Sequence, residues 1–197
     1  MIRIVALSVL ALALSARAQE TKQPAAQPGA QPGTPPAMAA PKPDPALAEA
    51  FQDAVGNWRC SGQMSMPPDM GGGQVQTRSR MSIRPESGGF AYAGEFRMEK
   101  TKSFPGMKGK ILWTYDPAAK KFYELAVDDG GGVMRGESDG MKDGKMTWAE
   151  EGAMMGKACK LRTTIINKSK DEIEIQMERQ GDGGTWTPMG KDSCKKG

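Results

Sequence analysis

The sequence predicts an all-β protein in which about ten antiparallel strands close into a barrel, preceded by one short helix. Three observations lead to this fold class. Apolar and polar side chains alternate through most of the chain after residue 56, as they do in strands with one buried face. Turn-forming residues separate these segments, and only one stretch has helical periodicity. Short strands without crossover helices favour an up-and-down barrel over a sandwich, because closure removes the unpaired edges of the sheet.

Residues 1–18 have the three parts of a secretory signal peptide. Arg3 makes the amino end positive, the stretch 4–14 is apolar apart from Ser8, and Ala16-Arg17-Ala18 supplies a cleavage site. A helix over 4–14 would rise only ~16 Å, about half of a bilayer's hydrocarbon core, so cleavage is expected rather than retention as an anchor. No later stretch is apolar enough to form a transmembrane segment, and the residue directly after the cleavage site is Gln19 rather than a cysteine that could carry a lipid. We therefore expect a secreted or periplasmic protein.

Residues 19–43 predict a disordered linker. This segment consists mainly of Pro, Ala, Gln and Gly, with almost no large side chains. Such a composition buries too little apolar surface to offset the entropy lost when the backbone becomes ordered. The folded domain is therefore expected to cover residues 44–197, a length that suits one domain with a single core.

One short amphipathic helix is expected to open this domain. Asp44 can accept a hydrogen bond as the N-cap, and Pro45 fits the first helical position. Leu47 and Phe51 recur on one face, and Gly56 provides a stop. Such a helix would plug or cover one end of the barrel.

The strands follow from alternation with a period of two. The clearest is 172–179, in which Ile173, Ile175 and Met177 face one way and polar residues face the other. Turn chemistry supports the connections, since Asp143-Gly144 suits a type I′ hairpin. The expected strands are 57–66, 75–84, 89–99, 109–115, 121–128, 132–138, 145–151, 158–167, 172–179 and 185–193.

The three cysteines of the chain allow one disulfide and one free thiol in an exported protein. Cys60 lies in the first expected strand and Cys194 just beyond the last. Closure of the barrel makes those strands neighbours, so the topology favours a Cys60–Cys194 disulfide, with pairings through Cys159 as the alternatives. Cys159 shares a face with apolar residues and is expected to be a buried, unreactive thiol.

The sequence also excludes several chemistries. It contains no histidine, which rules out His-ligated haem, the usual catalytic zinc sites and nucleophilic dyads with a histidine base. Arg3 and Arg17 account for two of the four net positive charges, so the mature chain has no electrostatic footprint for nucleic acid. The acidic pairs Glu150-Glu151 and Asp128-Asp129, and basic residues such as Arg80, are expected to be solvated. We predict no catalytic residues and no cofactor.

Methionine is unusually abundant, with fifteen residues in the chain. Met64, Met66 and Met70 have the spacing of thioether ligands in exported Cu(I)-binding proteins, and soft sulfur ligands select Cu(I). The preferred interpretation is that Met64 and Met66 fill the core on the inward face of the first strand. Copper binding is kept as a lesser hypothesis, and no metal site is predicted.

A series of short motifs runs through the domain in a definite order: Gly56-Asn57-Trp58-Arg59-Cys60-Ser61-Gly62, Tyr115-Asp116-Pro117 with Lys120-Lys121-Phe122, Asp143-Gly144-Lys145 with Trp148, Arg162-Thr163-Thr164, Asp171-Glu172, Gly184-Thr185-Trp186 and Cys194-Lys195-Lys196. From Val55 to the C-terminus, the chain thereby resembles a family of secreted bacterial proteins classed as domain of unknown function family 1579. The resemblance implies a barrel of lipocalin-like or calycin-like appearance and supports the pairing of Cys60 with Cys194. It brings no catalytic residues.

Aromatic residues at inward positions are the candidates for lining a ligand cavity, because a small barrel can hold one ligand in its mouth. They are Trp58, Tyr92, Trp113, Trp148 and Trp186. The leading hypothesis is therefore a non-catalytic binding module for a small apolar or amphipathic ligand. The alternative for these side chains is that they fill the interior, and the alternative for the protein is a structural or partner-binding role in the cell envelope.

Overall fold

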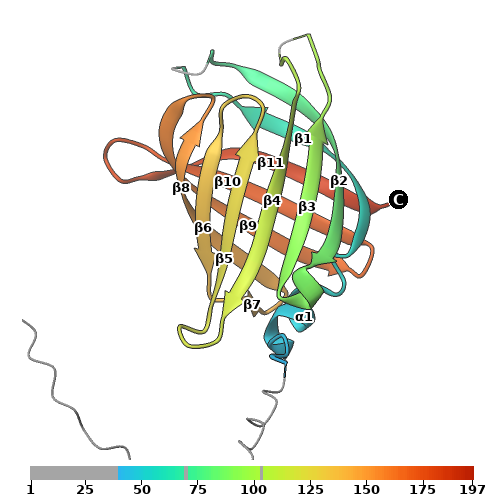
Figure 1. The fold of residues 1–197 in the computed structure, drawn as a ribbon. Helices are drawn as coiled ribbons and strands as arrows, with labels where there is room; N and C mark the ends of the chain where they lie inside the picture. The colour runs from blue at the N-terminus through green and yellow to red at the C-terminus, as the bar shows by residue number, and fades with distance from the viewer. Residues whose placement is uncertain (1–39, 69–70, 103) are drawn as a thin grey trace, which may run out of the picture. The chain divides into compact units, whose positions relative to one another are not determined.

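The computed structural model describes residues 40–68, 71–102 and 104–197. These residues form a closed antiparallel barrel with a helix at one end, as Figure 1 shows. Apart from β6 and β7, strands that follow one another in the chain are neighbours in the sheet; β1 pairs with β11, and β6 pairs with β8 to complete the ring. Ten strands form the ring, and β7 is a two-residue strand beside β8. The predicted fold class is confirmed.

The element bounds agree with the expected ones to within a few residues at most ends. The elements are α1 (Pro45–Phe51), β1 (Gly56–Ser65), β2 (Gln74–Glu86), the 3₁₀ turn η2 (Ser87–Gly89), β3 (Ala91–Met98), β4 (Met107–Asp116), β5 (Lys121–Asp128), β6 (Val133–Ser138), β7 (Met141–Lys142), β8 (Lys145–Met154), β9 (Lys157–Ser169), β10 (Glu172–Gln180) and β11 (Trp186–Lys196).

The expected signal peptide and residues 19–39 of the expected linker lie outside the described residues. Within the described part of the chain, no helix is both long and apolar enough to cross a bilayer.

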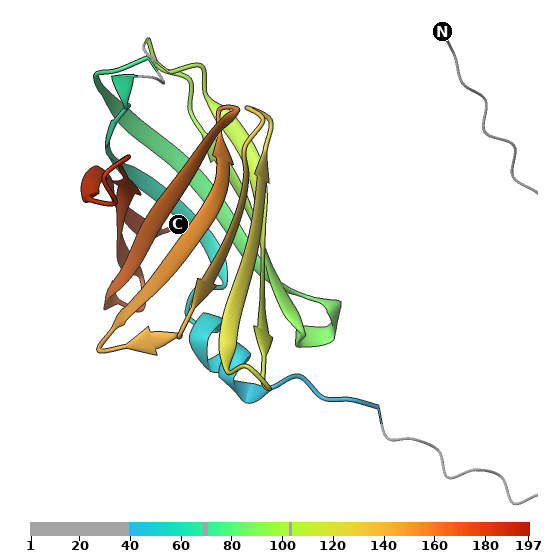
Figure 2. The ribbon, with the colours of Figure 1, turned by 90° about the vertical axis from the view of Figure 1, so that its left-hand side faces the viewer.

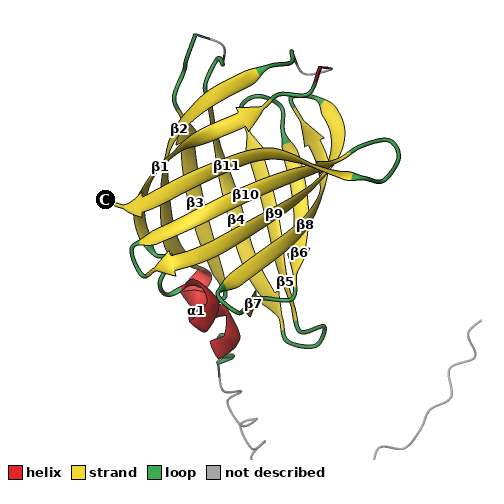
Figure 3. Ribbon diagram, turned by 180° about the vertical axis from the view of Figure 1, so that it is seen from behind, coloured by secondary structure: helices red, strands yellow, loops and turns green. Residues whose placement is uncertain are grey.

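Helix α1 begins as its sequence predicts. The Asp44 side chain accepts a hydrogen bond from the backbone N–H of Ala46 at 2.9 Å, and Pro45 occupies the first turn. Leu47 and Phe51 are buried, and the Phe51 ring lies 5.2 Å from that of Tyr92 between ring centroids. The apolar face of the helix therefore covers part of one end of the barrel, and Figures 2 and 3 show α1 at that end.

The end of α1 differs from the prediction. The helix ends at Phe51 with Gln52 as its C-cap, and Gly56 is the first residue of β1 rather than the helix stop. The reason is that Gly56 already pairs with Ile83 of β2, so the residues before it form the turn between the helix and the strand. Gly56 has a φ of +129°, a backbone conformation that favours glycine.

The Asp143-Gly144 turn is confirmed. Both residues have positive φ, 50° and 72°, and they join β7 directly to β8, as a type I′ hairpin requires. The short strand β7 was not predicted, because two residues carry no alternation that can be recognised.

The Cys60–Cys194 disulfide is also confirmed. The two residues lie directly opposite each other on β1 and β11, with a distance of 3.9 Å between their Cα atoms. The closed ring thus brings together two strands whose cysteines are 134 residues apart in the chain. Cys159 lies on β9 and is not part of this bond.

Candidate functional site: a cavity inside the barrel

The barrel encloses a cavity of about 500 Å³. Side chains from β1–β5 and β7–β11 form its wall, together with residues at the carboxyl end of α1. Asp53, Asn167, Ser169 and Lys170 also line it, and all four are exposed. The cavity therefore reaches solvent at the end of the barrel where α1 and the β9–β10 hairpin lie.

Three of the five predicted aromatic residues line this cavity: Trp58, Trp113 and Trp148, all of them buried. The Trp113 indole lies over Gly94 of β3, where a β-carbon would come within 2.6 Å of the ring. Tyr92 is buried as expected, but it packs against Phe51 of α1 and does not line the cavity.

The prediction that Trp186 faces inward is wrong. Arg162 lies over its ring, 4.7 Å from the centroid, and pairs with Glu178 on the outer face. The physical reason is a register shift between β10 and β11, where Met177 pairs with Gly190 but Glu178 pairs with Pro188. The extra residue reverses the alternation along β11, so that Trp186 lies outside although Cys194 lies inside.

Two glutamates meet inside the barrel, which the sequence analysis did not anticipate. Glu124 on β5 and Glu150 on β8 both lie directly opposite Gly136 of β6. Because Gly136 has no side chain, both glutamates lean over its backbone, and a β-carbon there would be 2.6 Å from Glu124 Oε1 and 3.0 Å from Glu150 Cγ. Trp113 Nε1 donates a hydrogen bond to Glu124 Oε2 at 2.9 Å, and Thr163 Oγ1 donates to Glu150 Oε2 at 2.5 Å.

The interior makes these carboxyl groups hard to ionise. Burial is the main cause that raises the pKa of Glu124 to about 9, and the nearby Glu150 adds to the shift, while the Trp113 hydrogen bond opposes it. Burial also raises the pKa of Glu150, against hydrogen bonds with Thr163 and Glu124 that lower it. The pair therefore holds a proton at neutral pH, and it can both donate and accept hydrogen bonds.

Asp192 of β11 adds a third carboxyl group to the cavity wall. It accepts a hydrogen bond from Thr77 Oγ1 at 2.5 Å, and burial raises its pKa. The cavity is thus an apolar chamber with a few polar groups at defined positions, as is typical of small-molecule sites.

The expectation that Glu150 is solvated is therefore wrong. A signal for its position was present in the sequence, since the alternation that places Trp148 inward also places Glu150 inward two residues later. The same rule connects Phe122 and Glu124 on β5. That the two glutamates meet could not be read from the sequence, because it depends on both of them pairing with Gly136 and therefore on the register of the strands.

Sulfur atoms gather at the barrel end away from α1. Met64 and Met66 pack there in one cluster with Cys159 of β9 and Met134 of β6, so both occupy the inward side as predicted. The Cys159 thiol donates to Met134 Sδ at 3.9 Å. Met70, the third predicted thioether ligand, lies outside the described residues. Among the residues that the structure describes, His, Cys, Asp and Glu form no group of three or more suited to a metal ion.

The sequence matches the model of a family described as "Protein of unknown function (DUF1579)" over residues 46–195. The chain belongs to this family. The match covers the barrel from α1 to the last residues of β11, and with it the cavity and the disulfide. No curated protein has a significant sequence match to the chain.

Solved structures similar to this DUF1579 protein share its fold at low sequence identity. Rv2717c from M. tuberculosis has a TM-score of 0.61 at 10% identity, and the match covers 79% of this chain and 99% of that one. The S-type phycobiliprotein lyase CPES from Guillardia theta has a TM-score of 0.50 at 11% identity, covering 77% of this chain and 92% of that one. This likeness shows the fold, a calycin-like barrel.

Proposed function

We propose that this protein is an exported binding protein that holds one small amphipathic ligand inside its barrel. The observation that carries the proposal is the cavity of about 500 Å³, which combines a mostly apolar wall with an inward-facing pair of carboxyl groups. Cavities of ~300–1,000 Å³ with a few convergent polar groups are typical of small-molecule sites. The calycin-like fold supports the proposal, and the expected signal peptide supports export.

The cavity wall has an apolar part and a polar part, and each indicates one part of the ligand. Trp58 and Trp148 offer flat apolar surfaces for a ring or an alkyl chain. The Glu124–Glu150 pair lies where a ligand's polar group can donate to a carboxyl oxygen and accept from a carboxyl O–H. A hydroxyl or amide group on an apolar body therefore fits this cavity best.

Native mass spectrometry of the protein purified from its own cells, followed by organic extraction, tests whether a ligand is bound. The mass of the polypeptide in the same spectrum gives the N-terminus and tests cleavage after Ala18. A second measurement uses the neutral fluorescent probe N-phenyl-1-naphthylamine with an emptied protein. Probe fluorescence that rises on addition of protein and falls on addition of the extract supports the proposal.

A matched pair of variants locates the probe. Ile175→Phe adds volume to a residue that lines the cavity, whereas Leu125→Phe adds the same ring to an exposed position on β5. We expect Ile175→Phe to weaken probe binding at least tenfold and Leu125→Phe to leave it unchanged. Equal binding by both variants would place the probe on the surface and refute the proposal.

Cu(I) binding is a second candidate function, favoured by one observation. The Cys159 thiol and the Met134 thioether are 3.9 Å apart in a cluster that also contains Met64 and Met66. Sulfur ligands of this kind select Cu(I) over harder metal ions. Competition with a chromogenic Cu(I) chelator under reducing conditions tests this candidate. We expect loss of binding in Cys159→Ser with Met134→Leu, but not in Met141→Leu, which changes a residue at the other end of the barrel.

A further inference from the structure

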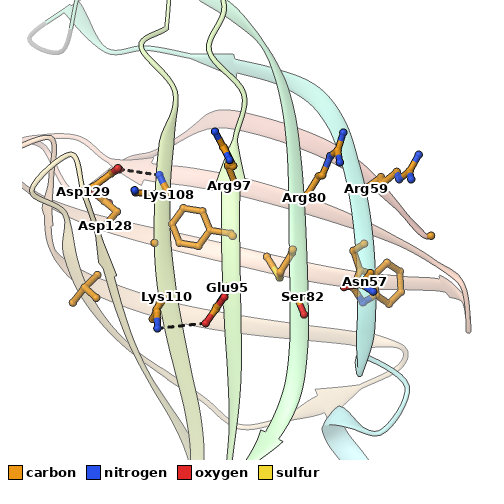
Figure 4. A pocket seen from close by; sticks show the side chains of 16 residues that line it. Asn57, Arg59, Arg80, Ser82, Glu95, Arg97, Lys108, Lys110, Asp128 and Asp129 are labelled. Carbon is orange, nitrogen blue, oxygen red and sulfur yellow. Dashed lines mark hydrogen bonds and ion pairs between the residues drawn. The ribbon is translucent and has the colours of Figure 1, made fainter.

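A row of four basic side chains crosses the outer face of the barrel from β1 to β4. Arg59, Arg80, Arg97 and Lys108 lie directly opposite one another on successive strands. All four are exposed, and Figure 4 shows them side by side. We call them the basic row. They line an outer groove of about 850 Å³, and the spacing of neighbouring strands makes the row ~14 Å long.

The basic row has little compensation within the protein. Arg80 is 3.9 Å from Glu99, and within the described ranges the other three members form no ion pair. Glu95, the acidic residue of the adjacent row, is already engaged by Lys110 and Arg84. Like charges directly opposite each other destabilise a sheet, so the basic row lowers the stability of the barrel. The barrel does not need these charges in order to close.

Exposed aliphatic side chains continue the same face onto β4, β5 and β6. Leu112 lies opposite Leu125, and Val127 lies opposite Val133, with exposed fractions of 45–49%. We call these four residues the aliphatic patch. Lys110 lies directly opposite Val127, so the patch and the groove beside the basic row are contiguous. Contiguous exposed apolar residues of this kind mark interaction surfaces.

We infer that this face of the barrel docks onto the surface of an anionic lipid bilayer. The basic row would contact phosphate head groups, and the aliphatic patch would enter the interfacial layer beside them, the two contributions that bind peripheral proteins to membranes. Asp128 and Asp129 lie beside Lys108, but these two negative charges are outnumbered by the four positive charges of the basic row. The inference is independent of the cavity and its ligand.

A bilayer is favoured over two other occupants because it uses both features. A linear polyanion would engage the basic row and leave the aliphatic patch exposed. A second copy of this chain that covered the patch with the same face would bring its own basic row, and the two rows would repel each other. Single-stranded nucleic acid needs aromatic residues for stacking, and the aromatic residues that line the outer groove, Trp58 and Phe96, belong to the inward-facing sets of β1 and β3.

Co-sedimentation with lipid vesicles tests the inference, using the exported protein with its N-terminus established by mass spectrometry. The vesicles are pure phosphatidylcholine or an equimolar mixture with phosphatidylglycerol. We expect binding to the anionic vesicles alone, weakened by salt. The variant Arg80→Ser/Arg97→Ser/Lys108→Ser should lose about a hundredfold in partition, since each basic residue near an anionic surface contributes about fivefold.

Two further variants make the test specific. Leu125→Ser/Val127→Ser should weaken binding about tenfold by removing apolar contact area. The control Lys145→Ser/Lys157→Ser/Lys160→Ser removes the same charge from exposed positions on β8 and β9 and should bind as the wild type does. All substituted side chains are exposed, so thermal melting should show each variant folded.

Three results would overturn the inference. The first is equal binding to neutral and anionic vesicles, or none to either. The second is loss of binding in the β8–β9 control to the same extent as in the basic-row variant. The third is a dimer in sedimentation velocity that dissociates in Leu125→Ser/Val127→Ser, because a second copy would then occupy the patch.

Discussion

Replacing Glu124 by glutamine should remove most of the pH dependence of stability between mildly acidic and alkaline pH. Glu124 has a pKa raised to about 9 from an ordinary value of 4.5. The folded protein therefore holds this proton more tightly than the unfolded chain does. Stability from this source is fully present below the unfolded pKa and is lost as the pH rises through the folded pKa.

The magnitude follows from the size of the shift. One pKa unit corresponds to about 1.4 kcal/mol, so a shift from 4.5 to about 9 amounts to as much as about 6 kcal/mol of unfolding free energy. Part of this is shared with Glu150, since the two groups contact each other. A change of this size is comparable with the total stability of a domain, ~5–15 kcal/mol. Glutamine keeps the shape of protonated Glu124 and the acceptor for Trp113, but it cannot ionise.

Urea unfolding followed by tryptophan fluorescence, repeated from about pH 5 to about pH 9, measures this effect. We expect the unfolding free energy of the wild type to fall by several kcal/mol across that window and that of Glu124→Gln to fall much less, because only the raised pKa values of Glu150 and Asp192 remain. Glu151→Gln is the matched control, because Glu151 is the exposed neighbour of Glu150 in the chain. Parallel pH profiles for wild type and Glu124→Gln would show that the carboxyl pair is not shielded from water, and the reasoning would fail.

Three further predictions follow from the geometry. Replacing both Cys60 and Cys194 by alanine should lower the unfolding free energy by about 5 kcal/mol, because the bond closes a loop of 134 residues; a loss below about 1 kcal/mol in urea unfolding would contradict the chain-entropy argument. Gly136→Val should cost about 1–3 kcal/mol and weaken probe binding, since its side chain would collide with both glutamates, and unchanged probe affinity would count against their role. Trp148→Ala should cost about 3–5 kcal/mol, as for a buried ring, and Trp186→Ala about 1 kcal/mol or less; equal losses would contradict their placement on opposite faces.

The parts of the fold that could be predicted are those with a local cause. Asp44 and Pro45 start the helix because the N-cap and the first helical position depend only on residues a few positions away in the chain. Strand alternation is likewise local, and it fixes which side chains share a face. The Cys60–Cys194 bond needed only one non-local assumption, that the first and last strands are neighbours, and a closed meander supplies it.

The parts that could not be predicted depend on register. Trp186 faces outward because of one extra residue in β11, and no residue in the sequence announces that irregularity. Glu124 and Glu150 meet only because β6 inserts Gly136 between their strands at the matching position. In the basic row, Arg80 is one member of a line that crosses four strands, whereas the sequence shows it only within its own strand.

The features proposed to carry function are all features that the barrel does not need for stability. An inward-facing carboxyl pair lowers stability at neutral pH, a line of like charges repels across a sheet, and the exposed aliphatic residues leave nearly half of their surface in water. A closed sheet can be built with apolar residues in place of Glu124 and Glu150, and with polar residues in place of Leu125. The rest of the domain follows the rules of its fold and is stabilised by a long-range disulfide. Residues that lower stability in such a domain are expected at positions that were selected for binding. The interior pair and the outer face are therefore the two places where substitutions should separate function from folding.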